Sequence, residues 1–239
     1  GQTDFTHGGI RGNRGDSPMP LGYAAFVAFD PTGRLYAGSY YDSIIYRFPA
    51  LLPANAAVAD YAIGTNTPGE RSVGGNDSLP LSASGIDITP SGRLFYSSSW
   101  FGGGGRVTWH NTLPTSGPSP HLWSNVIGQP DMNSFDVNQG GSPAAHTVYG
   151  PSDVSSDDTR VAVSDCGNNR VLVWNSIPTT NGQPADVVVG QPTFTTGQAN
   201  QGGVSATSMS CPTSVLLAEG RLFVADPNNN RVLVWNSIP

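Results

Sequence analysis

The sequence NNRVLVWNSIP occurs twice, at 168–178 and again at 229–239. The two copies are identical and lie 61 positions apart. Two shorter motifs recur in nearly the same phase: Gly-Gln-Pro at 128–130 and 190–192, and Asn-Gln-Gly-Gly at 138–141 and 200–203. A long identity with phased shorter matches indicates an internal repeat, which constrains the fold more strongly than any other sequence feature.

Weaker copies of the repeat precede these two. The tripeptide Gly-Arg-Leu, followed by an aromatic residue, occurs at 33–36, 92–95 and 220–223. Together the motifs divide the chain into four units of about 62 residues, the last one short: 1–63, 64–127, 128–189 and 190–239. We expect these units to form a single domain.

Each unit contains short runs of Val, Leu, Ile and aromatic residues between Gly, Pro and Asn, which is the pattern of strands and turns. The expected first strands are 26–29, 85–88, 152–155 and 214–217, and the second strands are 35–38, 94–97, 161–164 and 222–225. Third strands are expected at 171–174 and 232–235, and fourth strands at 57–63, 122–127 and 185–189. Up to four antiparallel strands per unit predict an all-β fold, a β-propeller with four blades in this chain. A β-solenoid is the alternative, but its units are usually shorter.

The composition agrees with an all-β protein. The 239 residues include 30 Gly, 20 Pro, 11 Arg, no Lys and only two Glu. Lys and Glu usually fill exposed helix faces, so a mainly helical protein is excluded. The net charge is −6, and no cluster of Arg gives the positive patch of a nucleic-acid-binding protein. No apolar run approaches the ~20 residues of a membrane-spanning helix.

Two stretches, 163–174 and 224–235, resemble the NHL repeat of β-propellers, and the neighbouring long loops resemble those of secreted bacterial members. The shared pattern is an apolar strand, an Asp, a short turn, Asn-Arg-Val and a second apolar strand. In the first two units, Ser39 and Ser98 replace the Asp, and Ile44 and Gly103 replace the Arg. The resemblance implies an NHL-type propeller whose two divergent units determine specificity.

Six polar residues recur in these stretches: Asp165, Asn169, Arg170, Asp226, Asn230 and Arg231. An Asp at the end of a strand can accept backbone N–H groups of the following turn, and the Arg can reach that Asp. We therefore expect a structural role. Calcium binding is the alternative, although each copy supplies only one carboxylate, whereas strong calcium sites collect several.

The two cysteines are too few for a disulfide scaffold and too far apart for a zinc ribbon. In a propeller, the loop between the second and third strands lies on the same face as the loop entering the next blade. Cys166 falls in the former and Cys211 in the latter. We predict a disulfide between them, which favours an oxidising compartment. Two separate thiols are the alternative.

The corresponding loops of the first two units contain four aromatic residues: Tyr40, Tyr41, Trp100 and Phe101. Exposed aromatic rings at loop tips can stack on sugars or anchor a peptide. The competing interpretation is that these rings cover the long inter-blade loops.

No catalytic residues are predicted, because the four histidines (His7, His110, His121 and His146) show no metal-ligand spacing and Gly-x-Ser-x-Gly is missing. We expect a non-catalytic extracellular or cell-surface module without cofactors or metal, with a protein or glycan ligand on its loop face. The alternative is a metal-dependent lyase or lactonase with its site in the central channel. The last unit has no run equivalent to 185–189, so we expect either a fragment of a longer array or self-assembly through the incomplete last blade.

Overall fold

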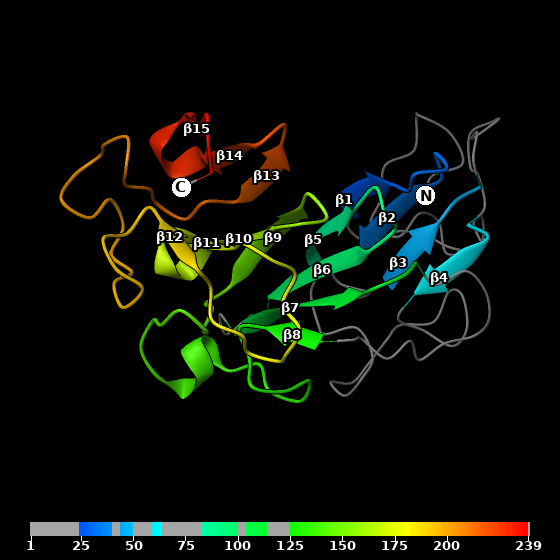
Figure 1. Cartoon of the computed structure of the whole chain (residues 1–239), viewed down its shortest axis with the longest axis horizontal. Coiled ribbons are helices and arrows are strands. Elements are labelled where there is room, and N and C mark those ends of the chain that lie inside the picture. Colours follow the sequence, from blue (N-terminus) through cyan, green and yellow to red (C-terminus); the bar gives the residue numbers. More distant parts are fainter. Residues whose placement is uncertain are drawn as a thin grey trace.

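The structure is a computed structural model, shown in Figure 1, and it describes residues 24–39, 44–49, 59–63, 83–99, 104–113 and 125–238. Its strands form four antiparallel sheets, and each sheet falls within one sequence unit. The only helical elements in these ranges are three short 3₁₀ turns: η1 (Val137–Gly140), η2 (Cys166–Asn168) and η3 (Pro227–Asn229). The all-β prediction is confirmed.

In every sheet the strands follow one another in chain order. Sheet 1 contains β1 (Ala24–Phe29), β2 (Leu35–Ser39), β3 (Ile44–Arg47) and β4 (Tyr61–Ile63). Sheet 2 contains β5 (Ala83–Ile88), β6 (Leu94–Ser99), β7 (Gly105–His110) and β8 (Asn125–Ile127). Sheet 3 contains β9 (Pro151–Ser156), β10 (Val161–Asp165), β11 (Arg170–Trp174) and β12 (Val187–Val189). Sheet 4 has three strands: β13 (Ser214–Ala218), β14 (Arg221–Asp226) and β15 (Arg231–Trp235). Each expected strand overlaps an observed one.

Local chemistry explains the turn between the first two strands of sheet 1. The carboxylate of Asp30 accepts hydrogen bonds from the backbone N–H groups of Thr32 and Arg34, at 2.8 and 3.0 Å. Gly33 has a φ of 81°, in the left-handed region that glycine adopts without strain. This turn aligns Leu35 opposite Phe29 and so sets the register of β1 and β2.

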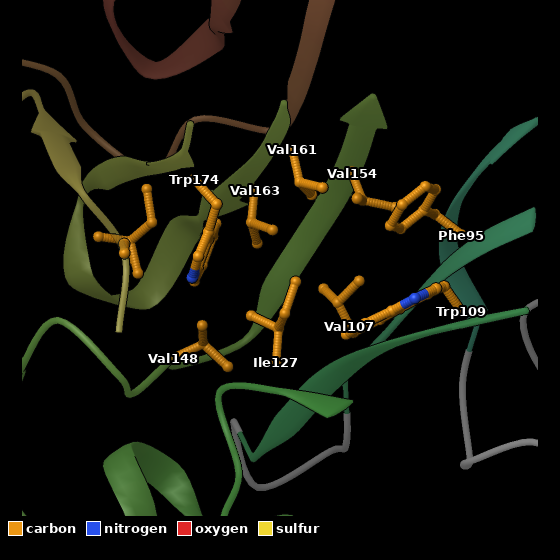
Figure 2. Packing of buried hydrophobic residues seen from close by; sticks show 11 residues of the cluster. Phe95, Val107, Trp109, Ile127, Val148, Val154, Val161, Val163 and Trp174 are labelled. Atoms are coloured by element: carbon orange, nitrogen blue, oxygen red, sulfur yellow. The ribbon is translucent and has the colours of Figure 1, made fainter. Parts of the chain in front are cut away.

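The sheets pack face to face, and three apolar clusters fill the spaces between successive sheets. Figure 2 shows the middle cluster, in which Phe95 and Trp109 of sheet 2 meet Val154, Val163 and Trp174 of sheet 3. Both faces of sheets 2 and 3 are therefore buried. This explains why β11 is apolar at four consecutive positions, with every residue of the strand buried.

The first strands of the four sheets lie side by side in the order β1, β5, β9, β13. Each contacts the next, so the sheets radiate from a common row of inner strands as propeller blades do. Within the described residues, no comparable contact joins β13 back to β1. Among the described residues, the four sheets thus form a series that runs from β1 to β13.

Candidate functional site

The turns that follow β10 and β14 lie against the long loops 128–150 and 190–213. At η2, the carboxylate of Asp165 accepts three hydrogen bonds: from the Tyr149 N–H at 2.7 Å, from Asn168 Nδ2 at 2.8 Å and from Arg170 Nε at 2.7 Å. Arg170 also donates to the carbonyl groups of Ala144 and Thr147, both at 2.9 Å. One buried ion pair therefore fixes the turn, the strand and the long loop together.

The same network is built a second time in sheet 4. Asp226 accepts from the Ser210 N–H at 3.0 Å, from Asn229 Nδ2 at 2.8 Å and from Arg231 Nε at 2.8 Å. In each unit the turn asparagine also exchanges amide hydrogen bonds with the asparagine of the Asn-Gln-Gly-Gly motif, Asn138 in one case and Asn200 in the other. Repetition of the whole network explains why the sequence repeats these residues. Both Asp carboxylates are occupied by protein donors.

The two carboxyl groups are both inaccessible to solvent, but their pKa values shift in opposite directions. Asp165 is completely buried, and burial raises the pKa of its carboxyl above the ordinary value despite the charge of Arg170. For Asp226, burial also acts to raise the pKa, but the hydrogen bonds from Asn229, Ser210 and Arg231 outweigh it and the pKa is lowered. The arginine partners also differ, because Arg170 is completely buried and Arg231 is 23% exposed.

Asn169 and Asn230 end the two turns in the left-handed conformation, with φ of 54° and 53°. Asparagine tolerates this region better than most residues. Asn169 also joins two units, because its side chain donates to the carbonyl of Gly197 at 2.8 Å and accepts from the Cys211 N–H at 2.9 Å. Beside it, Cys166 and Cys211 form the predicted disulfide.

The sequence did not reveal the role of the Gly-Gln-Pro motif. The buried amide of Gln129 donates to the carbonyl groups of Gly105 and Asp136, at 2.8 and 2.9 Å. Gln191 repeats this by donating to Asn169 and Gln198, at 2.9 and 2.8 Å. Each glutamine therefore connects a long loop to the start of the third strand of the preceding sheet, since Gly105 is the first residue of β7 and Asn169 directly precedes β11. The recurrence of the motif marked it as important, but only the fold shows its partners.

One sequence assignment was wrong. In sheet 2 the position of the conserved repeat arginine belongs to Arg106, not to Gly103, because Arg106 pairs with Ser98 as Arg170 pairs with Asp165. Arg106 is buried and donates to the carbonyl of Met132, much as Arg170 donates to the carbonyl of Phe194. The alignment without gaps failed because the loop after β6 is longer than the turns after β10 and β14.

The loop face is the side of the molecule formed by the long loops 128–150 and 190–213 and the turns η2 and η3. Among the described residues, two aromatic rings are exposed on it. Tyr149 precedes β9, and its ring lies so close over Gly167 in η2 that a Cβ on this glycine would come within 2.4 Å of it. Phe135 is exposed in the loop 128–150, where its carbonyl closely approaches Gly104. The predicted aromatic residues Tyr40, Tyr41, Trp100 and Phe101 lie outside the described residues.

The inner strands hold two partly buried carboxyl groups that sequence reasoning missed. Asp87 on β5 accepts from the Ser156 N–H at 2.6 Å, and Asp153 on β9 accepts from Ser214 Oγ at 2.7 Å and from the Val215 N–H at 3.1 Å. Burial raises the pKa of Asp153 to about 6, and neighbouring Asp87 adds to the rise. Both side chains connect successive sheets.

The described part of the chain contains no group of three or more His, Cys, Asp or Glu side chains placed to hold a metal ion. His110 is buried on β7 and His146 is exposed in a loop, while His7 and His121 lie outside the described ranges. None of the described helical segments is long and apolar enough to span a bilayer.

Comparison with known proteins finds similarity at the level of structure. The sequence matches no family model and none of the curated proteins. Similar solved structures include Chaetomium thermophilum Polycomb Repressive Complex 2 bound to GSK126, with 8% identity, a TM-score of 0.50, and coverage of 92% of this chain and 40% of that one. A Nidogen/Laminin complex has 12% identity and a TM-score of 0.49, covering 90% of this chain and 59% of the other. The Myceliophteria thermophila Cps50 (Swd1) beta-propeller domain has 11% identity and a TM-score of 0.48, with coverage of 90% of this chain and 54% of that one.

The chain therefore spans between two fifths and three fifths of the length of these three structures. At such low identities the likeness concerns the fold alone.

Proposed function

We propose that the chain is an NHL-type β-propeller module of four blades, the last one incomplete, that binds a protein or glycan ligand on its loop face without catalysis. The observation that carries this proposal is the pair of exposed rings, Tyr149 and Phe135, on a loop fixed by buried hydrogen bonds. Aromatic rings exposed on a rigid support lose little entropy on binding and stack well on sugars and peptide side chains.

Hydrogen bonds hold the loop 128–150, which carries both rings, in place. Arg170 and Gln129 donate to backbone carbonyl groups of the loop 128–150, and Asn138 anchors its centre to Asn168. Buried charge-assisted hydrogen bonds of this kind are among the stronger polar interactions in proteins. Polar side chains whose hydrogen bonds are taken up by the loop backbone cannot at the same time act on a substrate. This favours binding over catalysis.

We further propose an extracellular or cell-surface setting. The Cys166–Cys211 disulfide joins the turn after β10 to the loop before β13. Disulfides persist in oxidising compartments and are rare in the reducing cytosol. Low charge and a surface rich in Ser, Thr, Asn and Gln agree with this setting.

The proposal is tested with the purified chain on a glycan microarray and against a phage-displayed random peptide library. We expect at least one probe to bind and the double variant Tyr149→Ala/Phe135→Ala to lose at least tenfold in affinity. The matched control is Phe29→Ala, which removes an exposed ring at the opposite end of a sheet. Equal weakening by the control, or binding that survives the double variant, would contradict a loop-face site.

A further inference from the structure

One face of the Tyr149 ring rests on the protein. A Cβ placed on Gly167 would lie 2.4 Å from Cγ of the ring and 2.6 Å from both Cδ atoms, which puts the glycine under the flat of the ring rather than at its edge. Tyr149 is nevertheless 37% exposed. The glycine therefore supports one face of the ring, and the opposite face is left for a ligand.

Gly167 itself is held in place from both sides. Its neighbour Cys166 is bonded to Cys211, and its neighbour Asn168 is buried within the hydrogen-bond network described above. The Gly167 N–H also donates to the carbonyl of Tyr149 at 2.8 Å, so the glycine and the residue that carries the ring are directly joined. A ring whose support is already ordered loses little entropy when a ligand stacks on it.

The surface around this ring carries little charge. Segment 190–213 packs beside η2, the turn under the ring, since a Cβ on Gly197 would lie 3.4 Å from a backbone atom of that turn. Not one of the 24 residues of this segment is Asp, Glu, Lys or Arg, and eight are Ser or Thr. In the loop 128–150 the only Asp, Glu, Lys or Arg residues are Asp131 and Asp136, both exposed. The loop face therefore offers hydroxyl and amide groups and a weak negative charge.

We propose that Tyr149 stacks on the sugar rings of a neutral polysaccharide. This ligand class rests on the proposed function, since it concerns the same loop face. A pyranose ring presents C–H groups on its faces, and these pack against the face of an aromatic ring, which carries partial negative charge. Its hydroxyl groups both donate and accept hydrogen bonds, as do the Ser, Thr, Asn and Gln side chains of the loop face.

Charge favours a neutral sugar over other ligands. The carboxylates of Asp131 and Asp136 repel phosphate, sulfate and uronate groups, so an anionic polysaccharide or a nucleic acid is disfavoured. A protein partner is disfavoured for a different reason. Protein interfaces are enriched in Arg and depleted in Ser, and they use complementary charge for specificity. Segment 190–213 has no Arg and has Ser at three positions. An uncharged ligand rich in hydroxyl groups matches this surface better than either.

The experiment measures binding of the purified chain to single polysaccharides by affinity gel electrophoresis and isothermal titration calorimetry. The neutral probes are dextran, laminarin, a galactomannan and an arabinoxylan. The acidic probes are alginate and polygalacturonate, and a phage-displayed peptide library represents protein partners. We expect at least one neutral probe to bind and both acidic probes to fail. Because no charge pairing is involved, the affinity should change less than about twofold between about 0.02 and about 0.5 M NaCl.

The repeat itself supplies the variant that removes the ring. Ser210 donates its N–H to Asp226 as Tyr149 does to Asp165, so Tyr149→Ser places at this position the residue that the next unit uses. We expect this variant to fold, as verified by circular dichroism, and to bind the neutral probe about tenfold more weakly. Tyr149→Phe keeps the ring face and should stay within about twofold of wild type. The matched control Phe29→Ala removes an exposed ring from β1, outside the loop face, and should bind as wild type does.

Gly167→Ala tests the support separately from the ring. Its methyl group would come within 2.4 Å of the ring and displace it, so about fivefold weaker binding is expected. In the Tyr149→Ser background the same substitution should have no effect on binding, because no ring is left to displace. Gly141→Ala is the matched control, since its Cβ would lie 3.5 Å from the nearest atom, and it should leave binding unchanged.

The outcomes separate the ligand class from the loop-face site. If peptides bind in a Tyr149-dependent manner and no neutral polysaccharide does, the ligand class is wrong while the loop-face site stands. Stronger binding of an acidic probe, or binding of a neutral one that survives Tyr149→Ser, likewise overturns the stacking proposal alone. If no probe of any kind binds, both the stacking proposal and the proposed function are wrong.

Discussion

Nε of Arg170 lies 2.7 Å from Oδ2 of Asp165, and both side chains are completely buried. Removing one member of a buried ion pair leaves the other charge without compensation, which costs about 3–5 kcal/mol. We therefore expect Arg170→Ala to lower the free energy of unfolding by this amount in urea denaturation.

The second copy of the pair provides a matched control. Arg231 contacts Asp226 at 2.8 Å but is partly exposed. Water can therefore solvate the charge that remains in Arg231→Ala, and a loss of about 1–2 kcal/mol is expected. Equal losses at the two sites would show that burial by the next sheet does not determine the strength of this interaction.

The Cys166–Cys211 disulfide closes a loop with a sequence separation of 45 residues. A cross-link of this span restricts the unfolded chain, and we expect Cys166→Ser/Cys211→Ser to lower the free energy of unfolding by about 2–4 kcal/mol. Dithiothreitol should destabilise the wild type by a similar amount and leave the double variant unaffected. An intact mass without the loss of two hydrogens would show that the bond is missing.

The glycine of each Gly-Gln-Pro motif has no room for a side chain. A Cβ at Gly128, where φ is 85°, would lie 2.3 Å from Cγ2 of Val148. Backbone strain and overpacking together predict that Gly128→Ala costs about 2–4 kcal/mol, measured by thermal or urea unfolding. Gly33 has nearly the same φ, 81°, but open space around its Cβ position, so Gly33→Ala should cost only about 1 kcal/mol.

Burial of Asp153 predicts a specific pH dependence. Because its pKa rises from 3.8 to about 6, the folded state binds this proton more tightly than the unfolded state does. Its contribution to stability is therefore complete below about pH 4 and is lost as the pH rises through 6. The unfolding free energy of the wild type, measured relative to that of Asp153→Asn, should fall as the pH rises from 4 to 7.5, by at most about 3 kcal/mol.

Asp131 serves as the control for this pH series. Hydrogen bonds from the Asn133 N–H and from Ser134 lower its pKa, so its contribution is lost as the pH falls, opposite to Asp153. The difference between wild type and Asp131→Asn should therefore stay constant over most of the series and shrink only at its acid end. A difference for Asp153→Asn that stays constant from pH 4 to 7.5 would contradict the inferred burial of its charge.

The repeat in the sequence was sufficient to predict much of the fold. Alternating apolar runs between Gly, Pro and Asn predicted the strands, because strand and turn preferences are local. The paired copies 163–174 and 224–235 also singled out Asp165, Arg170 and their equivalents. Arg106 was missed because a gapless comparison cannot find a residue displaced by a longer loop. The NHL assignment and the ligand-binding role of the loop aromatics remain predictions.

By itself, the sequence determined the strand order, the antiparallel hairpins and the turn chemistry, since these depend on residues close together in the chain. The tertiary structure alone decided which faces are covered. Val173 and Val234 are in identical local sequences, yet one is buried and the other half-exposed, because sheet 4 packs on that face of sheet 3, whereas no described sheet packs on the equivalent face of sheet 4. The raised pKa of Asp153 likewise depends on burial by the packing of the inner strands, and to a smaller extent on Asp87, 66 residues earlier in the chain, which that packing brings near it.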